Sequence, residues 1–334
     1  MENILLKEFI IFLLIIIIAL LKPDNQNNKG NIMTEKKCIK SETKDNFYRE
    51  MLELYFQNKK KFYAKGREFK MGRIGKPFTK SNIISFQDKL NYLLIYESPE
   101  DKTSIVDKIL LRNYSKKVLG EDICPSILKI YNNIEEINLK ELPDKFVIKC
   151  NHGSGMNILC EDKYKFDLPN AKLKLKKWLD INYGIHTFEY QYLNVKKKIF
   201  AETFLDKDII NYKFSCFSGE PKLIRVKASI EGKKLYNIYH TNWTKSNIEL
   251  ANEKYILTDR FKKPINLEKM IKYSKLLSSD FCYCRVDFYE VNKTLFLGEI
   301  TFTPFNSKVK YKDKKTEIYL GNLINISKIK SKNY

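Results

Sequence analysis

The sequence lacks the signatures of several common enzyme classes. It contains no G-x-S-x-G, H-E-x-x-H, G-x-G-x-x-G or P-loop motif, and its three histidines, at positions 152, 186 and 240, have no evident triad context. These absences argue against the usual serine hydrolases, zinc proteases and dinucleotide-binding enzymes.

None of the seven cysteines forms a C-x-x-C pair. With so few histidines to complete a ligand set, this argues against a zinc site. An odd, scattered set of cysteines also fits a reducing compartment better than a disulfide framework.

Acidic residues are outnumbered, 40 against 61 Lys and Arg, so the net charge is +21 and the pI is near 9.4. Such a charge can indicate binding to nucleic acid or to an anionic membrane. The lysines are spread along the chain rather than clustered, and biased codon use explains them as well. Nucleic acid is therefore not predicted as a partner, whereas an acidic glycan would suit the charge.

Only one long hydrophobic run occurs, thirteen apolar residues at 9–21. It falls short of the roughly 20 residues that span a bilayer, unless the flanking Lys7 and Glu8 reach the interface. No small-x-small cleavage site follows, and the lysines after residue 21 predict that the rest of the chain stays cytoplasmic. We predict a membrane anchor at 1–21, inserted through residues 4–21, and a polar linker at 22–45. The alternative is that Met33 is the true start.

The remainder predicts an α+β protein with helices first and a mainly antiparallel sheet region afterwards. Residues 46–135 have mostly helical patterns, including one over 104–120 that ends at Gly120. Residues 136–330 hold short apolar strands, together with a helix over 168–182 that a proline opens.

A lysine interrupts the apolar strand predicted at 145–150. Phe146, Ile148 and Cys150 share one face of this strand, and Val147 and Lys149 share the other. The glycine-containing loop that follows, 151–157, can offer backbone N–H groups to an anion beside the lysine. The alternative is an ordinary turn with an exposed lysine.

The last predicted hairpin carries two carboxylates. A three-residue turn at 292–294 would place Asp287 and Glu299 directly opposite each other on one face, whereas a two-residue turn would separate them. Two adjacent carboxylates repel unless a cation lies between them, and such hard oxygen ligands suit Mg²⁺. The alternative is a surface hairpin with solvated charges.

Single charged residues also interrupt the other apolar strands: Glu202, Lys213 and Arg225. One charge per strand, recurring across a sheet, predicts a polar site lined by that sheet.

In order and spacing, several stretches resemble the TupA-like ATP-grasp family, which is linked to teichuronopeptide and cell-surface polysaccharide synthesis. They lie between about residues 66 and 305 and read VDKILLRNYSKKVLGEDICP, LPDKFVIKCNHGSGMNI, FAETFL, YKFSCFSGEPKLI and CRVDFYEVNKTLFLGEITFTP. The resemblance implies an ATP-grasp fold, two α+β subdomains that grip a nucleotide, over residues 136–330. A helical region at 46–135 and the hydrophobic segment would precede it.

The resemblance also implies roles for particular residues. Lys149 would hold the α- and β-phosphates of ATP, with Lys108 or Arg112 reaching them from the preceding region. The loop residues His152, Gly153, Ser154 and Gly155 would fold over the nucleotide, and Glu202 would face adenine and ribose. Asp287 and Glu299 would bind Mg²⁺, and Lys213 and Arg285 would act on the γ-phosphate or acyl phosphate. The implied reaction is an ADP-forming ligation of an unidentified carboxylate, on a glycan or a peptide, with an amine or another nucleophile.

Three positions depart from the family pattern. Met156 stands where the loop usually has its last glycine, Pro304-Phe305-Asn306-Ser307 replaces Pro-Gly-Ser-Gly, and Thr301 replaces a frequent asparagine. These departures put turnover in doubt more than nucleotide binding.

Two other functional classes remain open. One is a transferase of polysaccharide assembly, either kinase-like or a glycosyltransferase, although the only D-x-D sequence is Asp206-Lys207-Asp208 in a predicted loop. The other is a non-catalytic basic module that binds polyanions in a salt-sensitive way.

Overall fold

The computed structural model describes residues 53–54, 57–73, 75–251 and 253–329. The chain divides into two compact units, residues 1–77 and residues 78–334. The predicted anchor and linker lie outside the described residues and stay predictions. No helix within the described part of the chain is both long and apolar enough to cross a membrane. In the first unit, helix α3 (Lys59–Lys70) begins after Asn58, whose side chain accepts a hydrogen bond from the Lys61 N–H.

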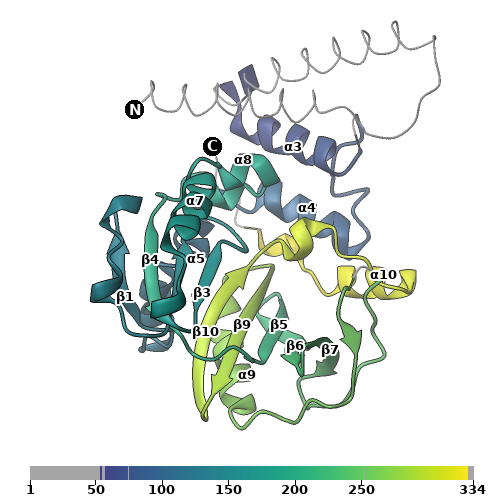
Figure 1. Ribbon diagram of the computed structural model, residues 1–334. Helices are drawn as coiled ribbons and strands as arrows, with labels where there is room; N and C mark the ends of the chain where they lie inside the picture. Colours follow the sequence, from purple (N-terminus) through teal and green to yellow (C-terminus); the bar gives the residue numbers. More distant parts are fainter. Residues whose placement is uncertain (1–52, 55–56, 74, 252, 330–334) are drawn as a thin grey trace, which may run out of the picture. The chain divides into compact units, whose positions relative to one another are not determined.

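The second unit contains helices, short 3-10 turns and two sheets (Figure 1). Its helices are α4 (Phe86–Tyr96), α5 (Thr103–Val106), α6 (Leu111–Leu119), α7 (Leu168–Leu179), α8 (Tyr183–Thr187), α9 (Leu267–Ser278) and α10 (Lys314–Asn322). The turns are η1 (Pro99–Lys102), η2 (Ile134–Glu136), η3 (Leu139–Glu141), η4 (Lys163–Lys165), η5 (Tyr190–Tyr192), η6 (Pro304–Ser307) and η7 (Ile326–Lys328).

The first sheet has four antiparallel strands in the order β1-β4-β2-β3, and the second has six in the order β10-β9-β5-β6-β7-β8. Only the β7–β8 pair of the second sheet is parallel. The strands are β1 (Ile127–Tyr131), β2 (Phe146–Cys150), β3 (Asn157–Cys160), β4 (Ile199–Thr203), β5 (Asn211–Phe217), β6 (Glu220–Ile230), β7 (Lys233–His240), β8 (Ile256–Leu257), β9 (Tyr283–Val291) and β10 (Thr294–Thr301). Residues 204–210 join the two sheets between β4 and β5. This arrangement confirms the α+β class.

One face of the first sheet is apolar. Phe146, Ile148 and Cys150 on β2 are fully buried in a cluster that includes Leu175 of α7. Burying each large apolar side chain contributes about 1.5–3 kcal/mol, which fixes this face toward the helix. Lys149 is consequently turned to the other face, as the alternation in the sequence predicts.

The second sheet is divided in the same way. Phe214 on β5 and Val286 and Phe288 on β9 are fully buried with Met270 and Leu277 of α9. Since neighbours along a strand alternate in direction, Lys213 and Asp287 point away from this helix. The charged face of the second sheet therefore follows from the packing of its apolar face.

The first strand begins earlier than predicted. β1 lies within the region 46–135 that the sequence predicts to be mostly helical, and it pairs with β4. The structure thus puts sheet residues ahead of the predicted boundary at 135/136. The pairing partner lies about 70 residues further along the chain, so local pattern does not reveal the strand.

The helix predicted over 104–120 is broken in two. Asp107 interrupts it, because its Oδ1 accepts hydrogen bonds from the Ile109 N–H at 2.8 Å and the Leu110 N–H at 3.3 Å. Such local bonds compete with helical ones. The second half, α6, ends as predicted at Gly120, whose φ of 79° places it in the left-handed region that glycine adopts readily.

Candidate functional site

Four charged residues form one row across the second sheet, one on each of four neighbouring strands. The strand register pairs Glu299 with Asp287, Asp287 with Lys213, and Lys213 with Arg225. Directly paired residues share a face, and successive strands are about 4.8 Å apart. The charges that the sequence scatters one per strand are therefore adjacent in the fold.

The turn behind this row is not the predicted one. Val291 pairs with Thr294, so the turn has two residues, Asn292 and Lys293, both with positive φ (49° and 66°). Two residues in this conformation make a common hairpin turn, and with a regular ladder it would separate the carboxylates. A β-bulge between Leu297 and Glu299 shifts the register by one residue and restores the pairing of Glu299 with Asp287.

Gly298 makes the bulge possible. A Cβ atom added at this position would lie 2.6 Å from the nearest atom of the Tyr289 ring. Any other residue would have to displace the outer end of this ring, so glycine is favoured here by close approach rather than by its backbone angles.

Asp287 is fully buried and surrounded by cations. Arg285 donates to both carboxylate oxygens, from Nε at 2.6 Å and from a terminal nitrogen at 2.7 Å, and Lys213 forms an ion pair with the same group. Burial alone would raise the pKa of Asp287, but Arg285 and Lys213 outweigh it and hold the pKa below its ordinary value. Asp287 is therefore a carboxylate that protein cations already neutralise.

Arg285 also links the second carboxylate to the first. It donates to Glu299 Oε1 at 3.0 Å and to Thr301 Oγ1 at 3.3 Å, and the Thr301 hydroxyl donates to Glu299 at 3.2 Å. The threonine that replaces the frequent asparagine thus orients Glu299.

The first sheet contributes a separate ion pair, between Lys149 and Glu202. The Lys108 ammonium donates to the Gly153 carbonyl in the loop after β2. Burial lowers the pKa of Lys108, while Glu299 of the second sheet and Glu202 of the first oppose that shift. Lys108, Lys149, Glu202 and Glu299 consequently belong to one electrostatic neighbourhood.

The glycine loop between β2 and β3 leaves part of its backbone accessible. Ser154 and Gly155 are exposed, and Gly155 has a φ of 75°. Gly153 is buried, and a Cβ there would lie 2.8 Å from the Tyr183 ring. Met156 is buried in the apolar cluster of the first sheet, so the departure from glycine at this position fills the core.

Asn151, at the start of the loop, joins three segments. Its Nδ2 donates to Asp107 Oδ2 and to the Lys196 carbonyl, both at 2.9 Å, and its Oδ1 accepts from the Lys198 N–H at 2.8 Å. These bonds fix the segment carrying Lys108 beside the loop. Asp107 is not among the predicted site residues, and Asn151 is predicted only as part of the loop 151–157; an aspartate between the apolar residues Val106 and Ile109 is the available signal.

His152 is buried beneath the loop rather than exposed in it. Its Nε2 lies 3.0 Å from the Trp178 carbonyl, to which an N–H can donate, and burial lowers its pKa to about 4. The His152 side chain therefore belongs to the protein interior and is not exposed in the loop.

The buried His152 predicts a pH-dependent stability. Its pKa falls from 6.5 to about 4 on folding, so the unfolded chain binds the extra proton between these values. Stability is then lost as the pH falls through this window, by on the order of 3 kcal/mol. Chemical unfolding of wild type and His152→Gln at pH 7 and pH 4 should show this loss in wild type only. His240→Gln, at an exposed position, is the control and should lose stability as wild type does. If the difference in free energy of unfolding between wild type and His152→Gln is the same at both pH values, His152 is not a neutral buried group.

Arg112 lies apart from this cluster. It forms an ion pair of 2.5 Å with Asp122 and donates to the Pro125 carbonyl. Of the two cations predicted to reach the phosphates, Lys108 is the one that the structure places beside Lys149.

Asp287 and Glu299 suit a magnesium ion only in part. Within the described residues, no group of three or more His, Cys, Asp or Glu side chains could hold a metal. Two carboxylates on neighbouring strands nevertheless match the one or two that Mg²⁺ takes when phosphate oxygens complete its shell. The two carboxylates therefore fit an Mg²⁺ ion that arrives bound to a phosphate ligand. Arg285 and Lys213 would also interact with that phosphate.

Comparisons with known proteins place these residues in a family. The model of the TupA-like ATP-grasp family matches residues 88–325, most of the chain. No curated protein matches the sequence.

Three solved structures illustrate the likeness. D-Alanine–D-alanine ligase from Bacillus anthracis with ATP has 15% identity, covering 67% of this chain and 63% of that chain, with a TM-score of 0.35. L-Amino acid ligase from Bacillus licheniformis has 12% identity, 60% and 41% coverage and a TM-score of 0.36. The ATP-grasp ligase PsnB with its minimal precursor has 12% identity, 64% and 60% coverage and a TM-score of 0.34. The chain thus spans less than two thirds of the length of each.

Proposed function

The chain belongs to the TupA-like ATP-grasp family, and on that premise we propose that it is an ADP-forming ligase that activates a carboxylate. One observation carries the proposal: Lys108, which donates to the loop of the first sheet at Gly153, also interacts with Glu299 of the carboxylate pair on the second sheet. A nucleotide triphosphate with Mg²⁺ has the charges that this arrangement would recognise.

The residues divide the work between them. Lys149 and Lys108 would bind the α- and β-phosphates, and the exposed backbone at Ser154 and Gly155 would close over them. Glu202 would face adenine and ribose. Asp287 and Glu299 would hold Mg²⁺, which neutralises phosphate charge when bound.

Arg285 and Lys213 would act on the transferred group. A substrate carboxylate oxygen attacks the γ-phosphorus, the bond to the bridging oxygen breaks, and ADP leaves with that oxygen. An amine or another nucleophile then attacks the carbonyl carbon of the acyl phosphate, loses a proton and releases phosphate. Arg285 and Lys213 both contact Asp287, which supports a role for them beside a phosphoryl group bound with Mg²⁺ at that carboxylate.

The acceptor would be part of a cell-surface polysaccharide or peptide polymer. The family resemblance and the net charge of +21, which favours acidic substrates, support this finer proposal.

Calorimetry of the full-length chain with Mg·ATP tests the nucleotide site. We expect saturable, magnesium-dependent binding that Glu299→Ala weakens about 100-fold, which corresponds to roughly 2.7 kcal/mol. Lys222→Ala, at an exposed position of β6, should bind normally. A folded wild type that does not bind Mg·ATP but binds polyanions in a salt-sensitive way would reject the ligase and support the non-catalytic module.

A further inference from the structure

Arg225 ends the charged row and is less well neutralised than the other members. Its nearest acidic partner is Glu253 Oε2, at 3.7 Å from a terminal nitrogen, which is beyond hydrogen-bond distance. Its Nε and Glu253 Oε2 are both buried without a hydrogen-bond partner. A buried guanidinium with open donors costs free energy unless another group satisfies them.

Other cations increase this imbalance. Burial lowers the pKa of Arg225, and Arg285 lowers it further against the opposing effect of Glu253. Glu253 is shared with Lys227, whose Nζ lies 3.5 Å from Glu253 Oε1. One carboxylate therefore serves two cations at this end of the row.

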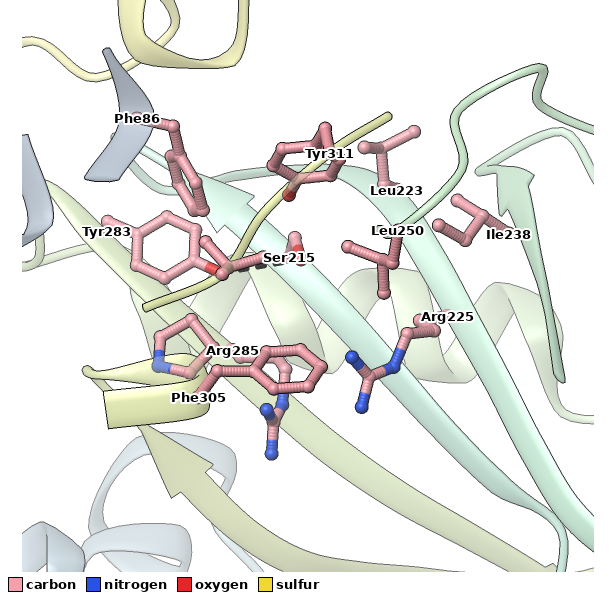
Figure 2. Close-up of a pocket in the computed structure, with 12 residues that line it drawn as sticks. Phe86, Ser215, Leu223, Arg225, Ile238, Leu250, Tyr283, Arg285, Phe305 and Tyr311 are labelled. Atoms are coloured by element: carbon pink, nitrogen blue, oxygen red, sulfur yellow. Dashed lines mark hydrogen bonds between the residues drawn. The ribbon is translucent and has the colours of Figure 1, made fainter. Parts of the chain in front are cut away.

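A small cavity lies beside Arg225. Arg225, Arg285 and Ser215 form its polar lining, the other lining residues are apolar or aromatic, among them Tyr283, Phe305 and Tyr311, and its volume is about 30 Å³. In Figure 2 both guanidinium groups point to the same side of the pocket, next to the Phe305 ring. This volume has room for about two water-sized groups, comparable with one carboxylate.

Phe305, which lines the cavity, begins a strained turn. Phe305, Asn306 and Ser307 each have a φ of 54°, at positions where the resemblance implies Gly-Ser-Gly. Left-handed angles are unfavourable for non-glycine residues, and such strain concentrates at functional sites. The strained turn sets the Phe305 ring 4.7 Å from the Arg225 guanidinium, and the Ser307 hydroxyl is buried without a partner.

We propose that Arg225 binds a second anionic group of the substrate, so that the ligase acts on compounds carrying two separated anionic groups. The inference rests on the proposed function, which places the carboxylate that attacks the γ-phosphorus near Arg285 and Lys213. Arg225 lies two strands away from Asp287, about 10 Å across the sheet. Phe305 and Tyr283 would pack against the chain or ring that joins the two groups.

Calorimetry with simple diacids tests this. The full-length chain is saturated with Mg·ADP and titrated with succinate, glutarate, adipate, pimelate and suberate, and with the monocarboxylic acid of each length. We expect at least one diacid to bind about 10-fold more tightly than its monoacid, because hydrogen bonds to charged groups are the stronger ones. Arg225→Met should remove this preference, whereas Arg225→Lys should keep part of it.

Two further measurements separate the possible outcomes. Lys222→Met, an exposed lysine on the same strand, should keep the preference, and all variants should bind Mg·ADP as wild type does. If Mg·ADP binds but no diacid is preferred, or if Arg225→Met keeps the preference, the second anionic site is rejected and the nucleotide site stands. If Mg·ADP itself fails to bind the folded wild type, both proposals fall.

Discussion

Gly298→Ala is expected to disable the nucleotide site although it replaces no charged residue. Its Cβ would lie 2.6 Å from the Tyr289 ring, so either the ring or the bulge must move. Overpacking of this kind costs about 1–3 kcal/mol, and a shift of the bulge turns Glu299 away from Asp287. Calorimetry should show a loss of Mg·ATP affinity similar to that of Glu299→Ala, and chemical unfolding should show the lower stability.

A second substitution shows whether the loss of affinity comes from the clash with the Tyr289 ring. Removing the ring in Gly298→Ala/Tyr289→Ala should restore much of the Mg·ATP affinity, because the bulge can then keep its register. Gly232→Ala is the matched control, since a Cβ there would meet no atom within 4 Å, although its φ of 73° costs some stability. Normal Mg·ATP binding by the single variant Gly298→Ala would contradict the role assigned to the bulge.

Replacing Asn151 by alanine is expected to give the largest loss of stability. It removes two donated hydrogen bonds and one accepted bond, and leaves the Asp107 carboxylate buried without its amide donor. The sum is about 3–5 kcal/mol, since bonds to a charged group are worth more than neutral ones. Urea unfolding at pH 7 measures this loss, and Mg·ATP affinity should fall as well because Lys108 is released.

Asn157, the exposed first residue of β3, provides the comparison. Asn157→Ala should change the free energy of unfolding by less than about 0.5 kcal/mol, as surface substitutions usually do. Equal stability of Asn151→Ala and Asn157→Ala would mean that the three segments are held together by other contacts.

Alternation along the strands was enough to predict which way the charged residues point. Phe146, Ile148 and Cys150 are buried in a row, so Lys149 had to lie on the opposite face, and the same holds for Asp287 beside Val286 and Phe288. This part of the site was predictable because burying apolar side chains determines the orientation of a whole strand.

Contacts between distant segments were not predictable in this way. The pairing of Lys149 with Glu202 joins strands about 50 residues apart, and the bonds of Asn151 connect segments near residues 107 and 197. The pairing of Asp287 with Glu299 was predicted from a three-residue turn, which is wrong. The local sequence pattern does not show that a two-residue turn and a bulge produce the same pairing. Gly298 within an apolar strand was the one sign that a bulge was present.

The ion pairs of the site have a consequence for how a nucleotide enters it. Lys149 pairs with Glu202 inside the first sheet, and Arg285 and Lys213 pair with Asp287 inside the second, so neither pair crosses from one sheet to the other. The polypeptide link between these strands is the segment 204–210. A hinge motion in this segment would open the site without separating these opposite charges, so these ion pairs would not oppose opening. Because these ion pairs do not hold the two sheets together, nucleotide binding would favour the closed form. The enzyme without nucleotide would favour the open form.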